Sequence, residues 1–312
     1  MTPFFSVIIP LYNKEDYIED TLKSVFNQSF KDFEIILIDD GSTDNSLQVV
    51  EQFNDNRLKV YTQNNQGASV ARNFGIEKAN SEYVALIDAD DLWYEDHLQE
   101  LKKLIDTFPQ AGLFCNNYEI NYNENFVKPA TFNFDYNNEC LIVEDFFKAN
   151  IINFIPSSSS VTFSKKYFID LGGYNTNFEI AEDIDLWIRF ALKYKVCFNP
   201  KITMTYNIFI DNSLSKQETN EVRYKFINNY RTEEKSNQEL KLYLDINRYA
   251  LAIRCKINNQ FNLYQKLKKE IDLKNLNLKQ KLLLNSPTSI LKIAKTVQRW
   301  LLRANLYLTA YK

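Results

Sequence analysis

Hydrophobic and polar positions along the first ninety residues predict strands and helices in alternation. Short apolar runs bounded by polar or turn-forming residues have the length of buried strands. Between these runs, apolar residues recur every three or four positions, which is the spacing of one helix face. The predicted strands cover residues 5–9, 33–38, 58–61 and 83–87, and the predicted helices cover residues 14–27, 47–53 and 69–78. This alternation favours an α/β sandwich with a mostly parallel sheet.

The pattern becomes mixed after the fourth strand and purely helical in the last hundred residues. Residues 116–180 contain a polar stretch whose elements the pattern does not order. Further helices are predicted at 95–107 and 183–194, and further strands at 112–119, near 196 and at 202–208. We therefore predict a first domain over residues 1–212, with halves at about 1–92 and 93–212, and an α-helical C-terminal region over residues 213–312.

Charge separates the two predicted parts of this 312-residue chain. The whole chain has a formal net charge of −3. Residues 241–312 hold 15 Lys and Arg against three acids, a net charge of +12, which leaves −15 for residues 1–240. Because 45% of the residues are hydrophobic, a sizeable core is expected in addition to this charged surface.

The scarcity of histidine, the spacing of the cysteines and the lack of a long apolar run exclude several classes of protein. A single histidine, His97, rules out a zinc site built from several histidines and leaves at most one Ser-His-Asp triad. The four cysteines form no Cys-x-x-Cys pair, so free thiols in a reducing compartment are expected. No apolar run approaches about 18 residues, and no basic leader follows Met1. We therefore expect a cytoplasmic protein that does not span a membrane.

Three carboxylates, Asp88, Asp90 and Asp91, follow the fourth predicted strand. In an open parallel sheet, ligands bind outside the carboxyl ends of the strands, so a site is expected here. Crowded carboxylates repel one another unless a cation lies among them, and hard divalent cations prefer oxygen ligands. The sequence thus favours metal binding. The alternative is that Asp90 or Asp91 only caps the next helix.

Two turns add further polar groups. The second predicted strand ends in Asp39 and Asp40, and the turn that follows begins with Gly41; a turn with a helix cap explains only part of this acidic pair. Gly67 opens a helix that carries Arg72, and both helix N-termini and arginines attract phosphate. The glycine motifs of dinucleotide dehydrogenases and P-loop enzymes are absent from the sequence, which argues against both classes.

A fourth segment combines Gly172 and Gly173 with Glu182 and Asp183 at the start of a predicted helix. Asp183 shares a helix face with apolar residues, among them Trp187. An acid in this position either caps the helix by accepting backbone N–H groups or acts as a base in a cleft. Spacing alone favours the cap.

In this order, the segments resemble the nucleotide-sugar glycosyltransferases of family 2, which have the GT-A fold. The resemblance covers about residues 4–206 and lapses over the tail. It implies a GT-A-like, Rossmann-type sandwich with a mostly parallel mixed sheet, a donor half at about 1–92 and an acceptor half at 93–212. The matching segments are residues 6–13, 38–44, 65–67 with 71–73, 88–91 and 182–183.

The resemblance also implies roles for individual residues. The ring of Tyr12 would stack on the base of the donor, and Asp40 would accept from an imino N–H, which favours uridine or thymidine donors. The implied donor-binding set is Pro10, Tyr12, Asp40, Gly67, Arg72 and Asp88. The implied metal ligands are Asp90 and Asp91, which would hold Mn²⁺ or Mg²⁺ against the diphosphate. The implied acceptor or sugar set is Gly172, Gly173, Glu182 and Trp187.

Asp183 matches the catalytic base of the family, which reverses the preference for a cap. It would take the proton of an acceptor hydroxyl while that oxygen attacks the anomeric carbon opposite the leaving group, so that configuration inverts. An ordinary carboxylate pKa of about 3.9 is expected to suffice for this role. The resemblance thus implies a hexosyltransferase-type enzyme of polysaccharide biosynthesis, with a UDP-sugar donor and a glycan or lipid-linked acceptor.

Residues 289–308 predict a two-faced helix. Its apolar arc contains Ile290, Ile293, Ala294, Val297, Leu301, Ala304 and Leu308, opposite Lys292, Lys295, Arg299 and Arg303, with Trp300 at the margin. Such a helix can lie on an anionic bilayer, so peripheral association with the inner face of the cytoplasmic membrane is one expectation. The other is that the stripe packs on neighbouring helices. Nucleic acid is not expected, because residues 1–240 are acidic and no nucleic-acid module is recognisable.

Two other function classes stay open at this point. Paired carboxylates also serve glycoside hydrolases, although the clustering of the acids disfavours that chemistry. The chain would alternatively be a catalytically inactive sugar-nucleotide-binding or scaffold protein. Thermal stabilisation by a donor without turnover on any acceptor would favour this last class.

Overall fold

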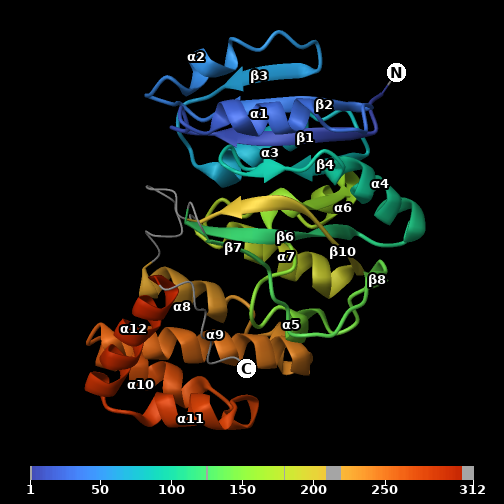
Figure 1. Ribbon diagram of the computed structural model, residues 1–312. Helices are drawn as coiled ribbons and strands as arrows, with labels where there is room; N and C mark the ends of the chain where they lie inside the picture. Colours follow the sequence, from blue (N-terminus) through green and yellow to red (C-terminus); the bar gives the residue numbers. More distant parts are fainter. Residues whose placement is uncertain (1, 124–125, 179, 209–218, 304–312) are drawn as a thin grey trace. The chain divides into compact units, whose positions relative to one another are not determined.

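A computed structural model describes residues 2–123, 126–178, 180–208 and 219–303, which form two compact units (Figure 1). The first unit comprises residues 1–131, 135–144 and 154–213, and the second comprises residues 132–134, 145–153 and 214–312. The first unit is built around a sheet, and the second is helical.

Parallel strands form one half of the sheet of the first unit (Figure 1). Strand β1 (Phe5–Leu11) pairs in parallel with β2 (Phe33–Asp39) on one side and with β4 (Tyr83–Leu86) on the other. Strand β2 pairs in parallel with the edge strand β3 (Leu58–Thr62). The carboxyl ends of these strands therefore meet at one edge of the sheet, which brings the segments after them together.

The other half of the sheet is mixed. Strand β9 (Val161–Ser164) runs antiparallel to both β4 and β6 (Leu113–Asn123). Beyond it, β10 (Val196–Asn207) runs parallel to β6 and is one continuous strand with register shifts, where the sequence predicted two pieces. Three short strands, β5 (Leu92–Trp93), β7 (Phe126–Pro129) and β8 (Leu141–Ile142), complete a sheet of ten strands within the described residues.

The helices of the first unit cover the sheet, and all of them except α6 match predicted helices. They are α1 (Ile18–Phe26), α2 (Ser46–Val50), α3 (Ala68–Lys78), α4 (His97–Thr107), α6 (Lys165–Asp170) and α7 (Glu182–Lys193). The interior positions of β1 and β2 are fully buried, which explains their nearly unbroken apolar sequences.

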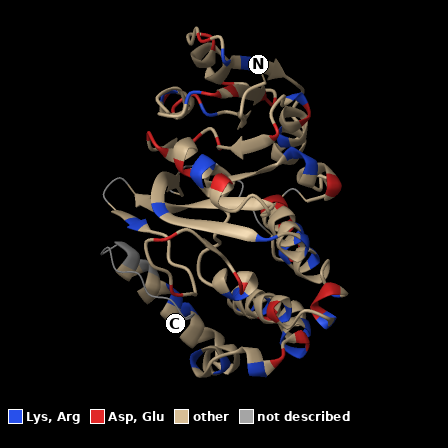
Figure 2. Cartoon of the chain, turned by 90° about the vertical axis from the view of Figure 1, so that its right-hand side faces the viewer, with Lys and Arg blue, Asp and Glu red and all other residues tan. Residues whose placement is uncertain are grey.

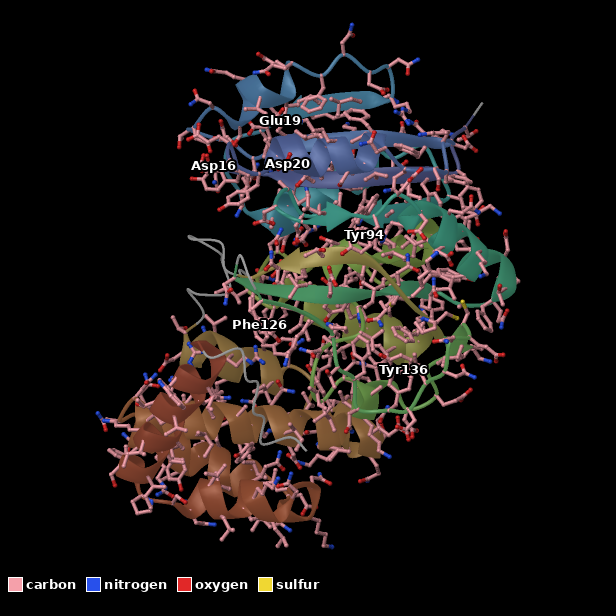
Figure 3. The ribbon with its side chains drawn as sticks, viewed as in Figure 1. Asp16, Glu19, Asp20, Tyr94, Phe126 and Tyr136 are labelled. Carbon is pink, nitrogen blue, oxygen red and sulfur yellow. The ribbon has the colours of Figure 1, made fainter. Side chains whose placement is uncertain are left out.

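Helix α1 begins four residues later than predicted. Asn13 has a left-handed backbone with a φ of 50°, and its Oδ1 accepts the backbone N–H of Thr43 at 2.8 Å. This bond ties the loop after β1 to the loop after β2. Acidic side chains at residues 16, 19 and 20 lie around the start of α1 (Figure 3), where they interact favourably with the helix dipole.

The second unit contains α8 (Asn220–Asn228), α9 (Gln238–Ile257), α10 (Phe261–Glu270), α11 (Leu278–Asn285) and α12 (Thr288–Arg303). The short helix α5 (Phe146–Ala149), from the middle of the chain, also belongs to it. Phe147 of α5 contacts the ring of Tyr243 on α9, with 6.2 Å between the ring centroids. Nothing in the sequence indicated that this segment joins the helical unit.

Most of the cysteines and the single histidine are buried. Cys115, Cys197 and Cys255 are buried free thiols, and Cys140 is a partly exposed one. His97 is fully buried; its Nδ1 lies 2.7 Å from the hydroxyl of Thr203, and burial lowers its pKa to about 3. No helix in the described part of the chain is long and apolar enough to cross a bilayer.

Candidate active site

Asp40, at the end of β2, fixes the loop that leads into α3. Its Oδ1 accepts hydrogen bonds from the Gln63 amide group at 2.7 Å and from the Gln66 backbone N–H at 2.9 Å. Its Oδ2 accepts from the Gly67 backbone N–H at 2.8 Å. Each carboxylate oxygen has two acceptor sites, so Oδ2 retains one for a ligand. These three hydrogen bonds from the loop explain why a buried aspartate follows the strand.

Two glycines make this arrangement of loops possible. Gly41 has a φ of +74°, and a Cβ there would lie 2.9 Å from the backbone nitrogen of Asn65. Gly67, the N-cap residue of α3, has a φ of 89° and open space around the position of a Cβ. The first glycine is therefore required by contact and by conformation, and the second by conformation alone.

The end of β1 presents an aromatic surface beside these loops. Pro10 is partly buried within the strand, whereas Tyr12 directly after it is 45% exposed. An exposed ring next to a ligand loop can stack on a flat base. Their assignment to the donor-binding set stays a prediction.

Ser159 organises the acidic segment after β4. Its hydroxyl donates to Asp91 Oδ2 at 2.5 Å and accepts from the Asp88 backbone N–H at 2.9 Å. The other oxygen of Asp91 accepts from the Asn207 backbone N–H at 3.0 Å. Asp91 has 1% of its surface exposed, and its two hydrogen bonds hold the acidic turn in place. Its role as a metal ligand stays a prediction.

Asp90, in contrast to Asp91, pairs with a positively charged side chain. The Lys14 ammonium lies 2.6 Å from Asp90 Oδ2, and both side chains keep about a fifth of their surface exposed. Burial raises the pKa of Asp90, as does the charge of Asp88, while Lys14 opposes the shift. In Asp91, burial and then its neighbours Asp90 and Asp88 raise the pKa well above the usual range. This segment therefore gains from an added positive charge, and Asp90 is the carboxylate that can reach one.

Arg72 joins the end of β4 to the start of α7. Its guanidinium lies 2.7 Å from Asp88 Oδ1 and 2.8 Å from Glu182 Oε1, and it lies over the ring of Tyr174. Burial acts to lower the pKa of Arg72, but the two carboxylates outweigh it and raise the pKa well above the usual value. Arg72 thus bridges two acidic motifs that are almost a hundred residues apart in the sequence, which spacing could not reveal.

Asp183 lies beside this bridge and does not cap α7. The N-cap residue is Ala181, whose φ of 66° is left-handed, and Asp183 Oδ1 accepts only from the adjacent Ile184 N–H among the hydrogen bonds described. Burial of the carboxyl raises the pKa of Asp183 to about 7; the charge of Glu182 adds to the rise and Arg72 opposes it. The expectation of an ordinary pKa near 3.9 was wrong, because spacing contains no information on desolvation.

Buried phenols border the same region. Burial raises the pKa of Tyr206, with further contributions from Asp91 and Asp183, and Tyr118 packs edge-on against its ring. Burial likewise raises the pKa of Tyr118, and its hydroxyl donates to the Phe154 carbonyl at 2.7 Å. Both phenols therefore stay neutral near pH 7. Asp91 and Asp183 act on the same ring, so the acidic turn and the start of α7 face one region.

Three residues of the predicted acceptor set lie in a tight turn or in the core. Gly172 and Gly173 end α6 with φ values of 83° and 71°, and a Cβ on Gly173 would lie 3.0 Å from Asn73 Oδ1. Trp187 is fully buried against the rings of Phe163 and Phe190. The helix turns this side chain into the core, and the assignment of Trp187 to the wall of the acceptor pocket stays a prediction.

Several residues of the site were missed by the sequence analysis. Ser159 lies in a run of four serines that has no helical or strand period, and Lys14 was read as part of a helix. Tyr206 and Asn207 end β10, so the rule that ligands meet the carboxyl ends of parallel strands was the one signal for them.

Comparison with known proteins identifies the family. A model described as glycosyl transferase family 2 matches residues 6–172, which is more than half of the chain. The chain belongs to glycosyl transferase family 2. The resemblance seen in the sequence is thereby confirmed.

Relatives within family 2 match the N-terminal part. A protein named for teichuronic acid biosynthesis, TuaG of Bacillus subtilis, is 46% identical over 101 residues, which is 31% of this chain and 40% of TuaG. The glycosyltransferase GlyG of Streptococcus pneumoniae is 37% identical over 127 residues, or 40% of this chain and 42% of GlyG. The chain thus spans about two fifths of the length of these curated relatives.

Solved structures share the fold over nearly the whole chain. Residues 1–349 of TarS from S. aureus, solved with UDP-GlcNAc, superpose with a TM-score of 0.71 at 21% identity, covering 98% of this chain and 93% of that one. The mannosyltransferase PcManGT from Pyrobaculum calidifontis, solved with GDP-Man and Mn²⁺, gives 0.60 at 17% identity, covering 97% and 81%. The predicted GT-A-like fold with a helical C-terminal region is confirmed.

Proposed function

We propose that this family 2 protein is an inverting, metal-dependent glycosyltransferase that moves a sugar from a nucleoside-diphosphate sugar to an acceptor hydroxyl. The observation that carries the proposal is that Arg72 forms two ion pairs, one with Asp88 and one with Glu182. These contacts bring the acidic segment after β4 next to Asp183. A group for the donor diphosphate and a group for the acceptor proton thus lie side by side, as the transfer reaction requires.

The donor side uses the loops at the ends of β1 and β2. Tyr12 stacks on the base, and the free acceptor site of Asp40 Oδ2 takes the imino N–H of a uracil ring. Asp88 faces the ribose, and Gly67 lets the start of α3 approach the phosphates. UDP-GlcNAc in TarS and GDP-Man in PcManGT support a nucleotide-sugar donor, and Asp40 favours a UDP-linked one.

Asp90 is the residue that would hold Mn²⁺ or Mg²⁺. Among the described residues, no three His, Cys, Asp or Glu side chains are arranged to hold a metal ion by themselves. A single carboxylate fits a divalent ion that also takes oxygens from a bound diphosphate, and the Lys14 contact marks Asp90 as a site for positive charge. When bound, such an ion offsets the charge that develops on the departing nucleoside diphosphate.

Asp183 acts as the general base. Its carboxylate takes the proton of the acceptor hydroxyl as that oxygen bonds to the anomeric carbon of the sugar. The bond between that carbon and the diphosphate oxygen breaks on the opposite face, and its electron pair leaves with the nucleoside diphosphate. A pKa near 7 matches this role, because about half of the base is ionised at neutral pH and the carboxylate still holds the proton well.

The acceptor is proposed to be a hydroxyl of a glycan or of a lipid-linked sugar, within the synthesis of a polysaccharide. The name of TuaG supports a role in making a surface polymer. Glu182 is assigned to the acceptor side only through its neighbour Asp183, since its own carboxylate pairs with Arg72. A cytoplasmic site of action, at the inner face of the membrane, suits a lipid-linked acceptor.

A screen of nucleotide sugars tests this function. The full chain is incubated with each sugar nucleotide, with Mn²⁺ or with EDTA, and release of nucleoside diphosphate is measured with and without glycan acceptors. We expect release from a UDP-sugar that needs Mn²⁺ and increases with acceptor. Binding of a donor, seen as thermal stabilisation, without turnover on any acceptor would instead make the chain a sugar-nucleotide-binding or scaffold protein.

A further inference from the structure

Helix α12 in the second unit exposes a stripe of large apolar side chains. Ile290, Ile293, Val297 and Trp300 are 50%, 64%, 48% and 66% exposed, respectively. They recur at three- and four-residue intervals and therefore share one face of the helix. The helix is held to the unit by the opposite flank, where Leu291 is 3% exposed and where α12 contacts α9.

This result separates the two expectations for the basic tail. Packing on neighbouring helices would have buried the apolar stripe, but the structure buries Leu291 instead. Leu278 and Leu282, on one face of α11, are also largely exposed. In the first unit, exposed apolar residues such as Val60, Val127 and Ile169 come from different elements, and single exposed residues of this kind need no explanation. Residues 304–308 of the predicted helix lie outside the described residues.

The charge of the segment that carries the stripe indicates which class of partner fits this surface. Between residues 273 and 303 the sequence has seven Lys and Arg and no Asp or Glu. Lys279, Lys292 and Lys295 are exposed, and Lys and Arg recur along the helices of this unit (Figure 2). A second copy of the chain would bring a like-charged surface against this one. Nucleic acid would satisfy the charge but leave the apolar stripe in water.

We propose that α12 is a membrane-binding helix that lies flat on an anionic lipid surface, with Ile290, Ile293, Val297 and Trp300 inserted among the acyl chains. Lys292 and Lys295 lie on the opposite side of the same helix, so they add attraction to the anionic headgroups at longer range. This interaction is weak for a single helix of 16 residues, so the binding is reversible. The inference concerns a surface of the second unit and does not depend on the transfer reaction.

The tryptophans make this proposal directly measurable. The chain has three, and Trp93 and Trp187 are 4% and 0% exposed. Trp300 is therefore the one whose fluorescence responds to a change of solvent. We expect that vesicles of phosphatidylcholine with phosphatidylglycerol shift its emission to shorter wavelength and protect it from iodide quenching. Vesicles of phosphatidylcholine alone should have a much smaller effect, and salt should weaken the response.

The variant Ile290→Ser/Ile293→Ser/Val297→Ser retains Trp300 and alters only exposed positions, so it should fold as the wild type does. We expect its binding to anionic vesicles, measured by sedimentation of the full chain, to fall by roughly tenfold or more. The matched control Ser289→Ala/Thr296→Ala, on polar positions of the same helix, should bind as the wild type does. Donor turnover on a soluble acceptor should be equal in all three proteins.

Two results would overturn the proposal. In the first, anionic vesicles leave the emission of Trp300 unchanged, or the triple variant binds them as strongly as the wild type. In the second, the wild type forms a dimer in ultracentrifugation that the triple variant does not form, and no vesicle binding is seen. That outcome would assign the stripe to a second copy of the chain. Loss of transfer with intact vesicle binding would count against the proposed function alone.

Discussion

The carboxylates of the site are chemically alike but have different partners, and the partners decide what each can do. Asp91 is buried, and its two oxygens accept from Ser159 and Asn207. Asp90 pairs with the ammonium of Lys14, and Asp183 accepts one short-range bond from its own helix. These last two are therefore the carboxylates left free to meet a cation and a proton.

The raised pKa of Asp183 predicts how transfer depends on pH. Only the ionised carboxylate accepts a proton, and its pKa is about 7. We therefore expect kcat/KM to fall about tenfold for each pH unit below 7 and to level off above it. An ordinary carboxylate base would give a level profile down to about pH 4. The measurement is a pH–rate profile with saturating metal.

The neighbours of Asp183 provide the matched controls for that profile. Glu182→Gln removes a charge that raises the pKa of Asp183, so the acidic limb should move to lower pH. Arg72→Gln removes a charge that lowers this pKa, so the limb should move to higher pH. A limb that stays near pH 7 in both variants would show that another group titrates.

The ion pair between Lys14 and Asp90 predicts that Lys14 competes with a divalent cation for this carboxylate. Its ammonium occupies the carboxylate at 2.6 Å, so a divalent cation has to displace it. We expect Lys14→Met to lower the Mn²⁺ concentration that gives half-maximal turnover. Lys23→Met, which removes an exposed lysine paired with Glu19, is the control and should leave that concentration unchanged. If Lys14→Met raises the concentration instead, Lys14 assists metal binding and the account of this pair is wrong.

Helices and strands of the first unit were predictable where one local period ran through a whole element. Strands β1, β2 and β4 are apolar runs between turns, and the longer helices α1 and α4 each bury one side. The segment from β7 to β9 lacked such a period, because its short strands lie in the mixed half of the sheet, and β8 and β9 are specified by pairing with strands far away in the sequence. Long-range pairing of this kind leaves no local signal.

Gly173 gives a prediction for the turn that ends α6. Its φ of 71° is left-handed, and a Cβ would press on Asn73 Oδ1 and the ring of Phe168. We expect Gly173→Val to lower the free energy of unfolding by about 2 kcal/mol, measured by urea denaturation. Gly173→Asn tolerates the left-handed conformation better and should cost less. Equal losses in the two variants would mean that contact, and not backbone strain, sets the cost.

The chain as a whole has a division that composition indicated only in part. The change in net charge from −15 to +12 indicated two different parts of the sequence, but its boundary after residue 240 lies inside α9, and residues 214–240 belong to the second unit. It could not show that residues 145–153 leave the first unit and pack with α9, because that contact joins segments almost a hundred residues apart. The family relationship could be recognised from short motifs, whereas no motif contains information on the burial of Asp91 and Trp187.

Because residues 145–153 belong to the helical unit, the result of shortening the chain can be predicted. A chain that ends at residue 213 lacks α9, so Phe146 and Phe147, now 5% and 3% exposed, would lose their covering. We expect it to aggregate on expression. A chain that ends at residue 286 keeps α9 to α11 and should fold with an unchanged melting temperature within a few degrees. The comparison is by size-exclusion chromatography and thermal unfolding, and a soluble, monodisperse product from the shorter chain would contradict it.

The central claim is that one carboxylate, Asp183, takes the acceptor proton while other groups hold the donor. The most direct test compares the wild type with Asp183→Asn, an isosteric change that removes the base. Calorimetry with the UDP-sugar and Mn²⁺ should give similar donor affinity for both proteins, while the transfer rate of the variant should fall by roughly 10²-fold or more. Full transfer activity in Asp183→Asn would contradict the account.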